Sequence, residues 1–417
     1  MSDGPLKILF IVDFRSEISR GWIRHIASLG HSVHVVSSFP VEAGDESFPV
    51  TEVHLGLSQF VRMRAQDEKG IRPAGLATMV GRVASSDAVR RIWHAANSSF
   101  GGLEARRHLH KLRAVVEAFR PDLIHAMRIP YEGVLAARLG GPTPLLLSTW
   151  GNDLTLWAAR RRRMAAITRF TLNRADALHA DCRRDIALAE GYGFSSSRPT
   201  AVLPGGGGVD RHLFHAGEPD PAVLAELGLG TGSATVINPR GVREYVRNDC
   251  FLHAWPRVLR SRPDAVAVCV GMRGNPELER LRVELGVAGS VHLLPALPPP
   301  VLAEVFRSAV VSVSPSVHDG TPNTLLEAMA TGCLPVAGRL DSISEWIDDG
   351  VNGVFCDATD PTSIADAILM GLEDSQMQHS ASKMNDLIIS ERAERKKVMD
   401  DAVVFYRSIV EGKNRRP

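Results

Sequence analysis

Short runs of apolar, often β-branched residues alternate with segments of helical periodicity along almost the whole chain. Such runs, set between polar turns, are typical of strands buried on both faces of a parallel sheet. The strands predicted in this way are residues 7–12, 33–37, 122–126, 144–148, 200–203, 234–238, 265–270, 291–294, 309–313 and 334–337. Helices are expected between them, for example at residues 22–29, 103–119, 278–285 and 300–308.

This alternation predicts an α/β protein built from doubly wound parallel sheets. One such sheet rarely needs ~400 residues, so the 417 residues predict two Rossmann-like domains. A run of four glycines at residues 205–208 marks the break between them, although the same run is also compatible with a phosphate-binding loop. We therefore expect domains at residues 1–205 and 206–390, followed by a C-terminal segment at residues 391–417 in which residues 391–410 form an amphipathic helix.

The most informative segment follows the predicted strand at residues 309–313. Asp319 opens a Gly-Thr-Pro-Asn turn, a helical run covers residues 325–330, and Glu327 lies eight positions after Asp319. A polar turn between a parallel strand and a helix N-terminus binds anions, because free backbone N–H groups and the positive end of the helix dipole point at the ligand. A phosphate held there between two carboxylates that can bind sugar hydroxyls indicates a sugar nucleotide.

The composition is that of an ordinary globular enzyme, with 44% apolar and 23% charged residues. No stretch of ~18 apolar residues predicts a transmembrane helix. Residues 1–12 lack the basic start and cleavage site of a signal peptide, and the five scattered cysteines show no metal-ligand spacing. These features predict a cytoplasmic protein with reduced thiols and no metal site.

The net charge of +1 conceals an asymmetry between the two halves of the chain. Residues 1–205 hold 27 Lys and Arg against 19 Asp and Glu, whereas the remainder holds 21 against 28. Two halves that meet different partners would show this difference, and so would uneven surface charge without a role. The near-neutral total and the 6% aromatic content argue against a nucleic-acid partner.

The segment from Asp319 to Ala330 resembles the carboxylate-x7-Glu motif, in its Gly-x-Pro-Asn variant, of the retaining family-4 type glycosyltransferases (glycosyl transferases group 1). Residues 332–336, 350–353, 208–210 and 148–154 resemble further elements of that family, so the resemblance covers nearly the whole chain. It implies the GT-B fold, in which two Rossmann-like domains face each other across a cleft. It also implies that residues 1–205 bind the acceptor, that residues 206–390 bind a nucleotide sugar, and that the last helix crosses back to the first domain.

The resemblance implies roles on the donor side. Glu327 would accept hydrogen bonds from the ribose hydroxyls, and Asp319, one methylene shorter than the usual Glu, would contact the donor sugar. The backbone of the turn would face the diphosphate; its residues are Gly320, Thr321, Pro322, Asn323 and Thr324. Fixed cations suit a diphosphate. Arg240 matches the family's Arg, and Arg247, with Arg243 as second choice, takes the place of its Lys. The turn at Gly271 would lie near the base or act as a structural tight turn.

The first domain departs further from the family pattern. Met127 and Trp150 stand where some relatives have histidines, so a histidine base is not expected at either place. His125 is retained, either as a substrate ligand or as a buried core histidine. Asn152 and Asp153 are candidates for the acceptor side, although Asp153 is equally suited to capping the helix that follows.

These expectations combine into a metal-independent, retaining hexosyltransferase with no cofactor, which moves a sugar from a nucleoside-diphosphate sugar to a hydroxyl of a glycan or lipid-linked glycan. Polysaccharide biosynthesis is the expected setting. Alternatives are a sugar-nucleotide epimerase of the same fold and a catalytically weak nucleotide-sugar-binding protein. Basic runs at residues 106–111 and 160–163 predict peripheral contact with an anionic membrane on its inner face, or simply a solvated helical face.

Overall fold

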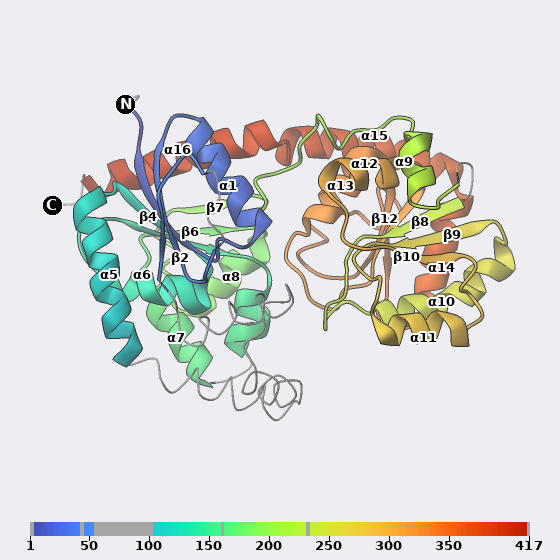
Figure 1. The fold of residues 1–417 in the computed structure, drawn as a ribbon, viewed down its shortest axis with the longest axis horizontal. Coiled ribbons are helices and arrows are strands. Elements are labelled where there is room, and N and C mark those ends of the chain that lie inside the picture. Colours follow the sequence, from blue (N-terminus) through green and yellow to red (C-terminus); the bar gives the residue numbers. More distant parts are fainter. Residues whose placement is uncertain (1–3, 42–45, 54–102, 160–161, 231–233, 415–417) are drawn as a thin grey trace, which may run out of the picture.

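The computed structural model describes residues 4–41, 46–53, 103–159, 162–230 and 234–414. The expected basic runs at 106–111 and 160–163 lie partly outside the residues whose side chains are described. Two parallel sheets with helices on their faces form two domains along the long axis of the molecule (Figure 1). The predicted α/β class with two doubly wound domains is therefore confirmed.

The first domain contains a seven-stranded parallel sheet in the order β3-β2-β1-β4-β5-β6-β7. Its strands are β1 (Lys7–Val12), β2 (Ser32–Ser37), β3 (Val50–Glu52), β4 (Leu123–Met127), β5 (Leu145–Thr149), β6 (Ala177–Ala180) and β7 (Thr200–Val202). The helices are α1 (Glu17–Ser28), α5 (Leu103–Phe119), α6 (Val134–Leu139), α7 (Arg162–Leu172) and α8 (Arg183–Gly191), with π-helical turns η2 (Ile129–Gly133) and η3 (Asp153–Ala158). The order of the strands along the chain reverses between β1 and β4, where doubly wound sheets bind ligands at the strands' carboxyl ends.

The second domain contains a six-stranded parallel sheet in the order β10-β9-β8-β11-β12-β13. Its strands are β8 (Ala234–Asn238), β9 (Ala265–Cys269), β10 (Val291–Leu293), β11 (Val311–Ser314), β12 (Leu334–Gly338) and β13 (Val354–Cys356). The helices are α9 (Pro221–Glu226), α10 (Asn248–Ser261), α11 (Pro276–Glu284), α12 (Pro299–Ser308), α13 (Asn323–Thr331), α14 (Pro361–Glu373) and α15 (Ser375–Arg392). The switch point of this sheet lies between β8 and β11, next to the turn at residues 319–324 that follows β11, called the donor turn below.

Burial on both faces explains why the strands are continuously apolar. In β1, Ile8, Phe10 and Val12 belong to one core cluster, whereas Leu9 and Ile11 belong to the cluster on the opposite face. Each sheet is therefore sandwiched between two apolar layers, as parallel sheets require.

The chain crosses between the domains twice, and the two crossings are hydrogen-bonded to each other. The Val209 amide donates to the Ala393 carbonyl at 2.7 Å, and the Arg395 amide donates to the Val209 carbonyl at 2.9 Å. Gly208, with φ +82°, passes so close to the Ala393 carbonyl that a Cβ would lie 2.4 Å from it. After this second crossing, α16 (Arg395–Asn414) packs on the first domain (Figure 1).

Candidate functional site

The turn after β11 leads into α13 without a side-chain cap. Pro322 holds the N-cap position with extended backbone (φ −69°, ψ 131°) and makes no side-chain cap hydrogen bond. Proline has no N–H, and no side-chain oxygen at the cap accepts from the first amides of the helix. The N-terminus of α13 therefore offers its backbone donors and its dipole to an anion.

Arg240 and Asp319 form a buried ion pair beside this helix N-terminus. The Arg240 Nη2 donates to the Asp319 carboxylate, and its Nη1 donates to Thr324 Oγ1 at 3.1 Å. Arg240 is 7% exposed, and its Nε has no hydrogen-bond partner. Burial raises the pKa of Asp319, and the charges of Arg240 and Arg243 offset part of that rise. The carboxylate predicted for the donor sugar is thus held by the guanidinium predicted for the diphosphate.

Glu327 lies on α13, where it is partly buried. Burial raises its pKa to about 7, against the opposing charges of Arg395 and Arg240. Arg395 belongs to the start of α16, so the segment that crosses back to the first domain brings a cation to the donor side. This carboxyl group is poised to change its protonation state near neutral pH.

The second cation is better placed at Arg243 than at Arg247. The Arg247 side chain is paired with Asp249 through two hydrogen bonds, at 2.9 and 2.7 Å. The Arg243 Nε donates to the Arg240 carbonyl at 3.1 Å, and the charge of Arg243, after that of Arg240, offsets part of the rise that burial gives the pKa of Asp319. The geometry therefore gathers Arg240, Arg243 and Asp319 and leaves Arg247 engaged at the start of α10. Arg247 as a diphosphate ligand stays a prediction without a contact to support it.

Gly271 lies at the end of β9 with φ +75°, a conformation that favours glycine. A Cβ at Gly271 would lie 3.3 Å from Gly241 Cα, and Gly241 also has a positive φ. The two glycines allow the loops after β8 and β9 to approach closely. This close packing explains why residue 271 is a glycine. The position of Gly271 near the nucleotide base stays a prediction.

The donor turn is packed directly against the first domain. A Cβ at Gly151 would lie 2.2 Å from the Gly320 amide nitrogen, and a Cβ at Gly320 would lie 2.3 Å from the Asp181 carboxylate. Thr321 Oγ1 donates to the Asp181 carbonyl at 2.6 Å. Gly151 and Asp181 follow β5 and β6, so the carboxyl ends of the two sheets meet at this turn.

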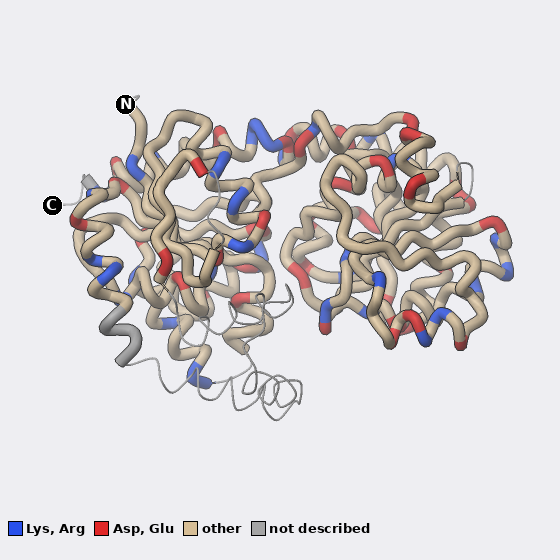
Figure 2. Tube along the Cα trace, in the orientation of Figure 1, with Lys and Arg blue, Asp and Glu red and all other residues tan. Residues whose placement is uncertain are grey.

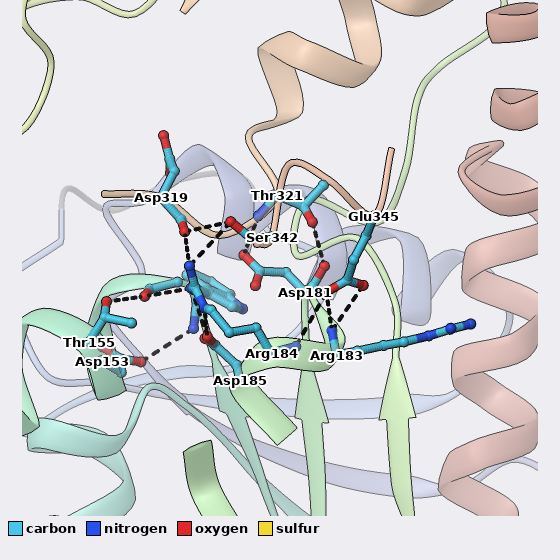
Figure 3. A network of polar contacts seen from close by, with 12 residues as sticks. Asp153, Thr155, Asp181, Arg183, Arg184, Asp185, Asp319, Thr321, Ser342 and Glu345 are labelled. Atoms are coloured by element: carbon cyan, nitrogen blue, oxygen red, sulfur yellow. Dashed lines mark hydrogen bonds and ion pairs between the residues drawn. The ribbon is translucent and has the colours of Figure 1, made fainter. Parts of the chain in front are cut away.

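Arg184 joins the two domains at the same place (Figure 3). Its Nη1 donates to the Asp319 carbonyl at 2.7 Å and to Ser342 Oγ at 3.2 Å, and its Nη2 donates to the Gly151 carbonyl at 3.2 Å. Its other edge binds the buried Asp185 at 2.9 and 2.7 Å. One guanidinium thus contacts the donor turn, a second-domain hydroxyl and the loop after β5.

Glu345 of the second domain caps α8 of the first. Its carboxylate accepts from the Arg183 amide at 2.8 and 3.0 Å and from the Arg184 amide at 3.2 Å. Figure 3 shows the Arg183 side chain extending away from this network. A carboxylate on a helix N-terminus is favoured by the helix dipole. The structure therefore has its domains closed on each other through α8 and the donor turn.

Among the described residues, Asp181, Cys182 and Asp185 form a buried group whose ligand atoms lie within 4.8 Å of one another. Burial raises the pKa of Asp181 and of Cys182, and Asp185 is already paired with Arg184. Acids whose ionised forms are disfavoured by burial, beside a guanidinium, are a weak ligand set for a cation. The expected absence of a metal nevertheless stays a prediction.

On the acceptor side, Asp153 is buried and accepts from Arg128 at 3.2 and 3.1 Å and from the Trp150 amide at 3.4 Å. Asn152 lies beside it, and its Oδ1 is buried without a hydrogen-bond partner. The cap position of η3 is held by Asn152, again without a side-chain cap hydrogen bond. The structure thus brings these two predicted residues together next to Gly151 and the donor turn.

His125 is fully buried, away from any accessible surface. Its ring nitrogens are hydrogen-bonded to Tyr406 Oη at 2.9 Å and to Ser148 Oγ at 2.6 Å. The Trp22 indole N–H also donates to Tyr406, at 2.7 Å. Burial holds the pKa of His125 well below its usual value. The geometry supports the core-histidine interpretation: His125 ties α16 to the first domain, and a role toward substrate has no contact behind it.

Known proteins place the chain in a family. The protein-family model described as "Glycosyl transferase 4-like domain" matches residues 17–206. The family model described as "Glycosyl transferases group 1" matches residues 240–374. The chain belongs to the group 1 glycosyltransferases. The first match lies in the first half of the chain and the second match lies in the second half.

Curated relatives of this glycosyltransferase are named D-inositol 3-phosphate glycosyltransferase. The one from Catenulispora acidiphila is 27% identical over 70% of this chain and 68% of its own length. The one from Thermobifida fusca is 32% identical over 46% of each chain. The chain thus spans about two thirds of the first relative and about half of the second.

Solved structures confirm the GT-B fold of the glycosyltransferase. The Anabaena protein HepE, solved with UDP and glucose, has a TM-score of 0.70 at 17% identity and covers 97% of this chain and 100% of its own. The sucrose-phosphate synthase of Thermosynechococcus elongatus has a TM-score of 0.73 at 15% identity, with coverage of 98% and 100%. At these identities the likeness shows the fold alone.

Helix length and surface charge bear on whether this glycosyltransferase contacts a membrane. None of its described helices combines the length and the apolar character that crossing a bilayer requires. Residues of both charge signs lie on both domains (Figure 2). Contact with an anionic membrane stays a prediction.

The sequence did not reveal Asp181, Arg184 or Glu345 as site residues. Asp181 and Arg184 follow β6, a four-residue strand that was not predicted. A carboxylate and an arginine directly after a strand would have been a signal once that strand was recognised. Glu345 carried no signal, because its role depends on contact with the other domain.

Proposed function

We propose that the protein transfers a sugar from a nucleoside-diphosphate sugar to a hydroxyl of a glycan or lipid-linked glycan, with retention of configuration and without a metal ion. The observation that carries this proposal is the uncapped N-terminus of α13 beside Arg240, with Asp319 in the turn before the helix and Glu327 in the helix itself. The bound UDP and glucose of HepE and the names of the curated relatives support a nucleotide-sugar donor and a sugar-like acceptor.

The proposed chemistry proceeds on one face of the donor sugar. The bond from the anomeric carbon to the diphosphate oxygen breaks as the acceptor oxygen bonds to that carbon, and the acceptor proton passes to the leaving phosphate. Negative charge grows on the diphosphate, where the Arg240 guanidinium and the α13 amides stabilise it. The residues position both substrates, which contributes much of the rate. Arg243 adds a second positive charge.

The epimerase alternative is not favoured, because the curated relatives quoted above are named as glycosyltransferases. A catalytically weak binding protein would bind nucleotide and show no acceptor-dependent turnover. Transfer of sugar from a radiolabelled donor to an acceptor distinguishes these possibilities, and a retained anomeric configuration in the product tests the proposed stereochemistry.

The first test is the melting temperature with UDP, GDP, ADP, TDP and their sugar conjugates, measured with EDTA present. A ligand at ~100 times its Kd adds about 2.7 kcal/mol to stability, which gives a clear upward shift. A shift with one nucleotide supports the proposal and identifies the base. Absence of a shift with every nucleotide, with and without Mg²⁺, would contradict it, and a shift only with Mg²⁺ would contradict metal independence.

Nucleotide affinity is expected to increase with pH through the pKa of Glu327, which burial raises to about 7. Ribose hydroxyls that donate to the carboxylate favour its ionised form, so below this pH binding must release a proton. The Kd should therefore fall up to ~10-fold per pH unit below pH 7 and level off above it. Titration calorimetry between pH 5.5 and 8.5 measures this, and Glu327→Gln should flatten the profile. An unchanged slope in that variant would remove Glu327 from the ribose site.

A further inference from the structure

Arg128 occupies the switch point of the first sheet without a role in the donor site. It directly follows β4, and its pKa is raised mainly by the charge of Asp153, with smaller contributions from Glu132 and from Asp13, which follows β1. The two strands are neighbours in the sheet. Ligands of doubly wound sheets bind beyond the carboxyl ends of the strands at such a point.

The backbone of Arg128 is held in an unfavourable conformation. Its φ of +126° and ψ of 148° are rarely adopted by a residue with a side chain. Such a conformation is strained and persists only where the surrounding structure enforces it, often at ligand clamps. The Gly133 amide donates to the Arg128 carbonyl at 2.8 Å, and a Cβ at Gly133 would lie 2.9 Å from that oxygen. The turn η2 therefore fixes the direction in which Arg128 leaves the sheet.

The Arg128 guanidinium is anchored and still has donors to offer. Its Nε and Nη2 both donate to one oxygen of Asp153, at 3.2 and 3.1 Å. Among the described residues, no other side chain or carbonyl accepts from it. The Arg128 side chain is 37% exposed, whereas that of Asp153 is 0% exposed. An arginine carries five N–H donors in a rigid fork, so Arg128 presents donors from a fixed base.

The neighbouring charges differ from Arg128 in this respect. Arg15 is paired with both oxygens of Asp13 at 2.9 and 2.8 Å, and its guanidinium lies 3.7 Å from the centre of the Phe39 ring. Glu132 is 1% exposed and accepts from the Ser38 hydroxyl. Burial raises its pKa to about 7, which keeps much of its charge off below neutral pH. Arg128 is therefore the cation of this group that can take a second partner.

Arg128 also lies next to the place where transfer would occur. Its anchor Asp153 is two residues from Gly151, which packs on Gly320 of the donor turn. Resting on the transferase function proposed above, we propose that Arg128 binds an oxyanion of the acceptor, a phosphate or carboxylate group carried near the accepting hydroxyl. Its fork matches the geometry of these anions. The acceptor is thereby an anionic glycan or sugar derivative rather than a neutral sugar.

The test measures inorganic phosphate binding to the full-length protein saturated with the nucleoside diphosphate that stabilises it most. Saturation blocks the α13 site, so calorimetry reports a second anion site. Arg128→Gln is expected to weaken phosphate binding by ~10-fold or more, since it removes a charge-assisted hydrogen bond to the anion. Arg128→Lys should retain part of the affinity. Glucose 6-phosphate and dodecyl phosphate, titrated in the same way, separate a soluble sugar phosphate from a lipid phosphate.

Two further variants separate binding from folding. Asp153→Asn keeps an oxygen for Arg128 and removes the competing charge, so phosphate should bind more tightly, whereas a merely structural role predicts weaker binding. Arg120→Gln is the matched control: Arg120 also has a positive φ, +50°, but precedes the amino end of β4, whereas Arg128 follows its carboxyl end. Its phosphate affinity should equal that of the wild type.

The proposal is overturned if phosphate does not bind the nucleotide-loaded wild type, or if Arg128→Gln binds it as well as the wild type does. Weaker phosphate binding in Asp153→Asn would also overturn it. These outcomes are distinct from failure of the transferase function, which the nucleotide melting shifts report. If no nucleotide binds, the same variants are compared in the ligand-free protein.

Discussion

Replacing Arg240 by alanine is expected to lower kcat by about 10²–10³-fold, because one preorganised donor to a charge that develops in the transition state contributes that much. Arg240 is suited to this task since it is buried, has an Nε without a partner and lies beside the uncapped start of α13. Arg240→Lys should fall between alanine and the wild type, because it keeps the charge but loses the fork. Steady-state kinetics at saturating donor measures the effect.

A matched control for Arg240 is Arg262→Ala. Arg262 follows the C-terminal end of α10, where its side chain is hydrogen-bonded to Asp264 at 3.0 and 2.9 Å on the surface. It makes no contact with the donor turn, so its kcat should match that of the wild type. If Arg240→Ala also retained wild-type kcat, the stabilisation of the leaving diphosphate would have to be assigned elsewhere.

Replacing Arg184 by alanine is expected to destabilise the protein by about 3–5 kcal/mol, since it leaves the buried Asp185 carboxylate without its partner. The same change removes the hydrogen bonds to Asp319 and Gly151 that join the domains. For domains of this size the melting temperature should fall by roughly 6–20 °C. Differential scanning calorimetry measures the shift, and activity assays well below the melting temperature report the loss of domain contact.

The neighbouring Arg183 provides the control, because its exposed side chain extends away from the network. Only its backbone amide binds Glu345, and Arg183→Ala keeps that amide. Its stability should stay within ~0.5 kcal/mol of the wild type. Arg184→Ala/Asp185→Asn should recover part of the loss by removing the unpaired charge. Equal effects of the two arginine variants would show that Arg184 is not the link between the domains.

Most buried strands were predictable, because a continuous apolar run of about four to eight residues between polar turns is typical of a buried strand. The expected strands at residues 7–12 and 234–238 match β1 and β8, and the other predicted strands differ from the observed ones by one or two residues at one or both ends. The missed strands are β3, β6 and β13, of three or four residues each. Runs this short carry little periodicity, so some of them, such as β7 and β10, are recognised while others are not. The last helix begins at Arg395 rather than 391, because residues 393–395 pair with Val209.

Site residues were predictable where a sequence motif fixes the local structure. They were not predictable where contacts with residues distant in the sequence determine the partners or the burial of a side chain. Asp319, Glu327 and the turn follow from strand, turn and helix in one segment. Arg243 and Arg247 lie in one polar loop, and the bonds to Asp249 that engage Arg247 cannot be read from spacing. His125 is hydrogen-bonded to Tyr406, which lies 281 residues later in the chain, so its burial in the core could not be predicted from the sequence.

The attachment of α16 to the first domain has a consequence for biosynthesis. The core of that domain includes Val398, Met399, Ala402, Tyr406 and Ile409 of α16. On the ribosome, β1–β7 are complete by Val202, yet Trp22 and His125 lack their Tyr406 partner until some 200 further residues are made. At typical elongation rates this wait lasts roughly 10–40 s. Until α16 is synthesised, the first domain of the nascent chain therefore exposes the apolar surface that α16 covers in the folded protein. Chaperones bind exposed apolar surfaces of this kind.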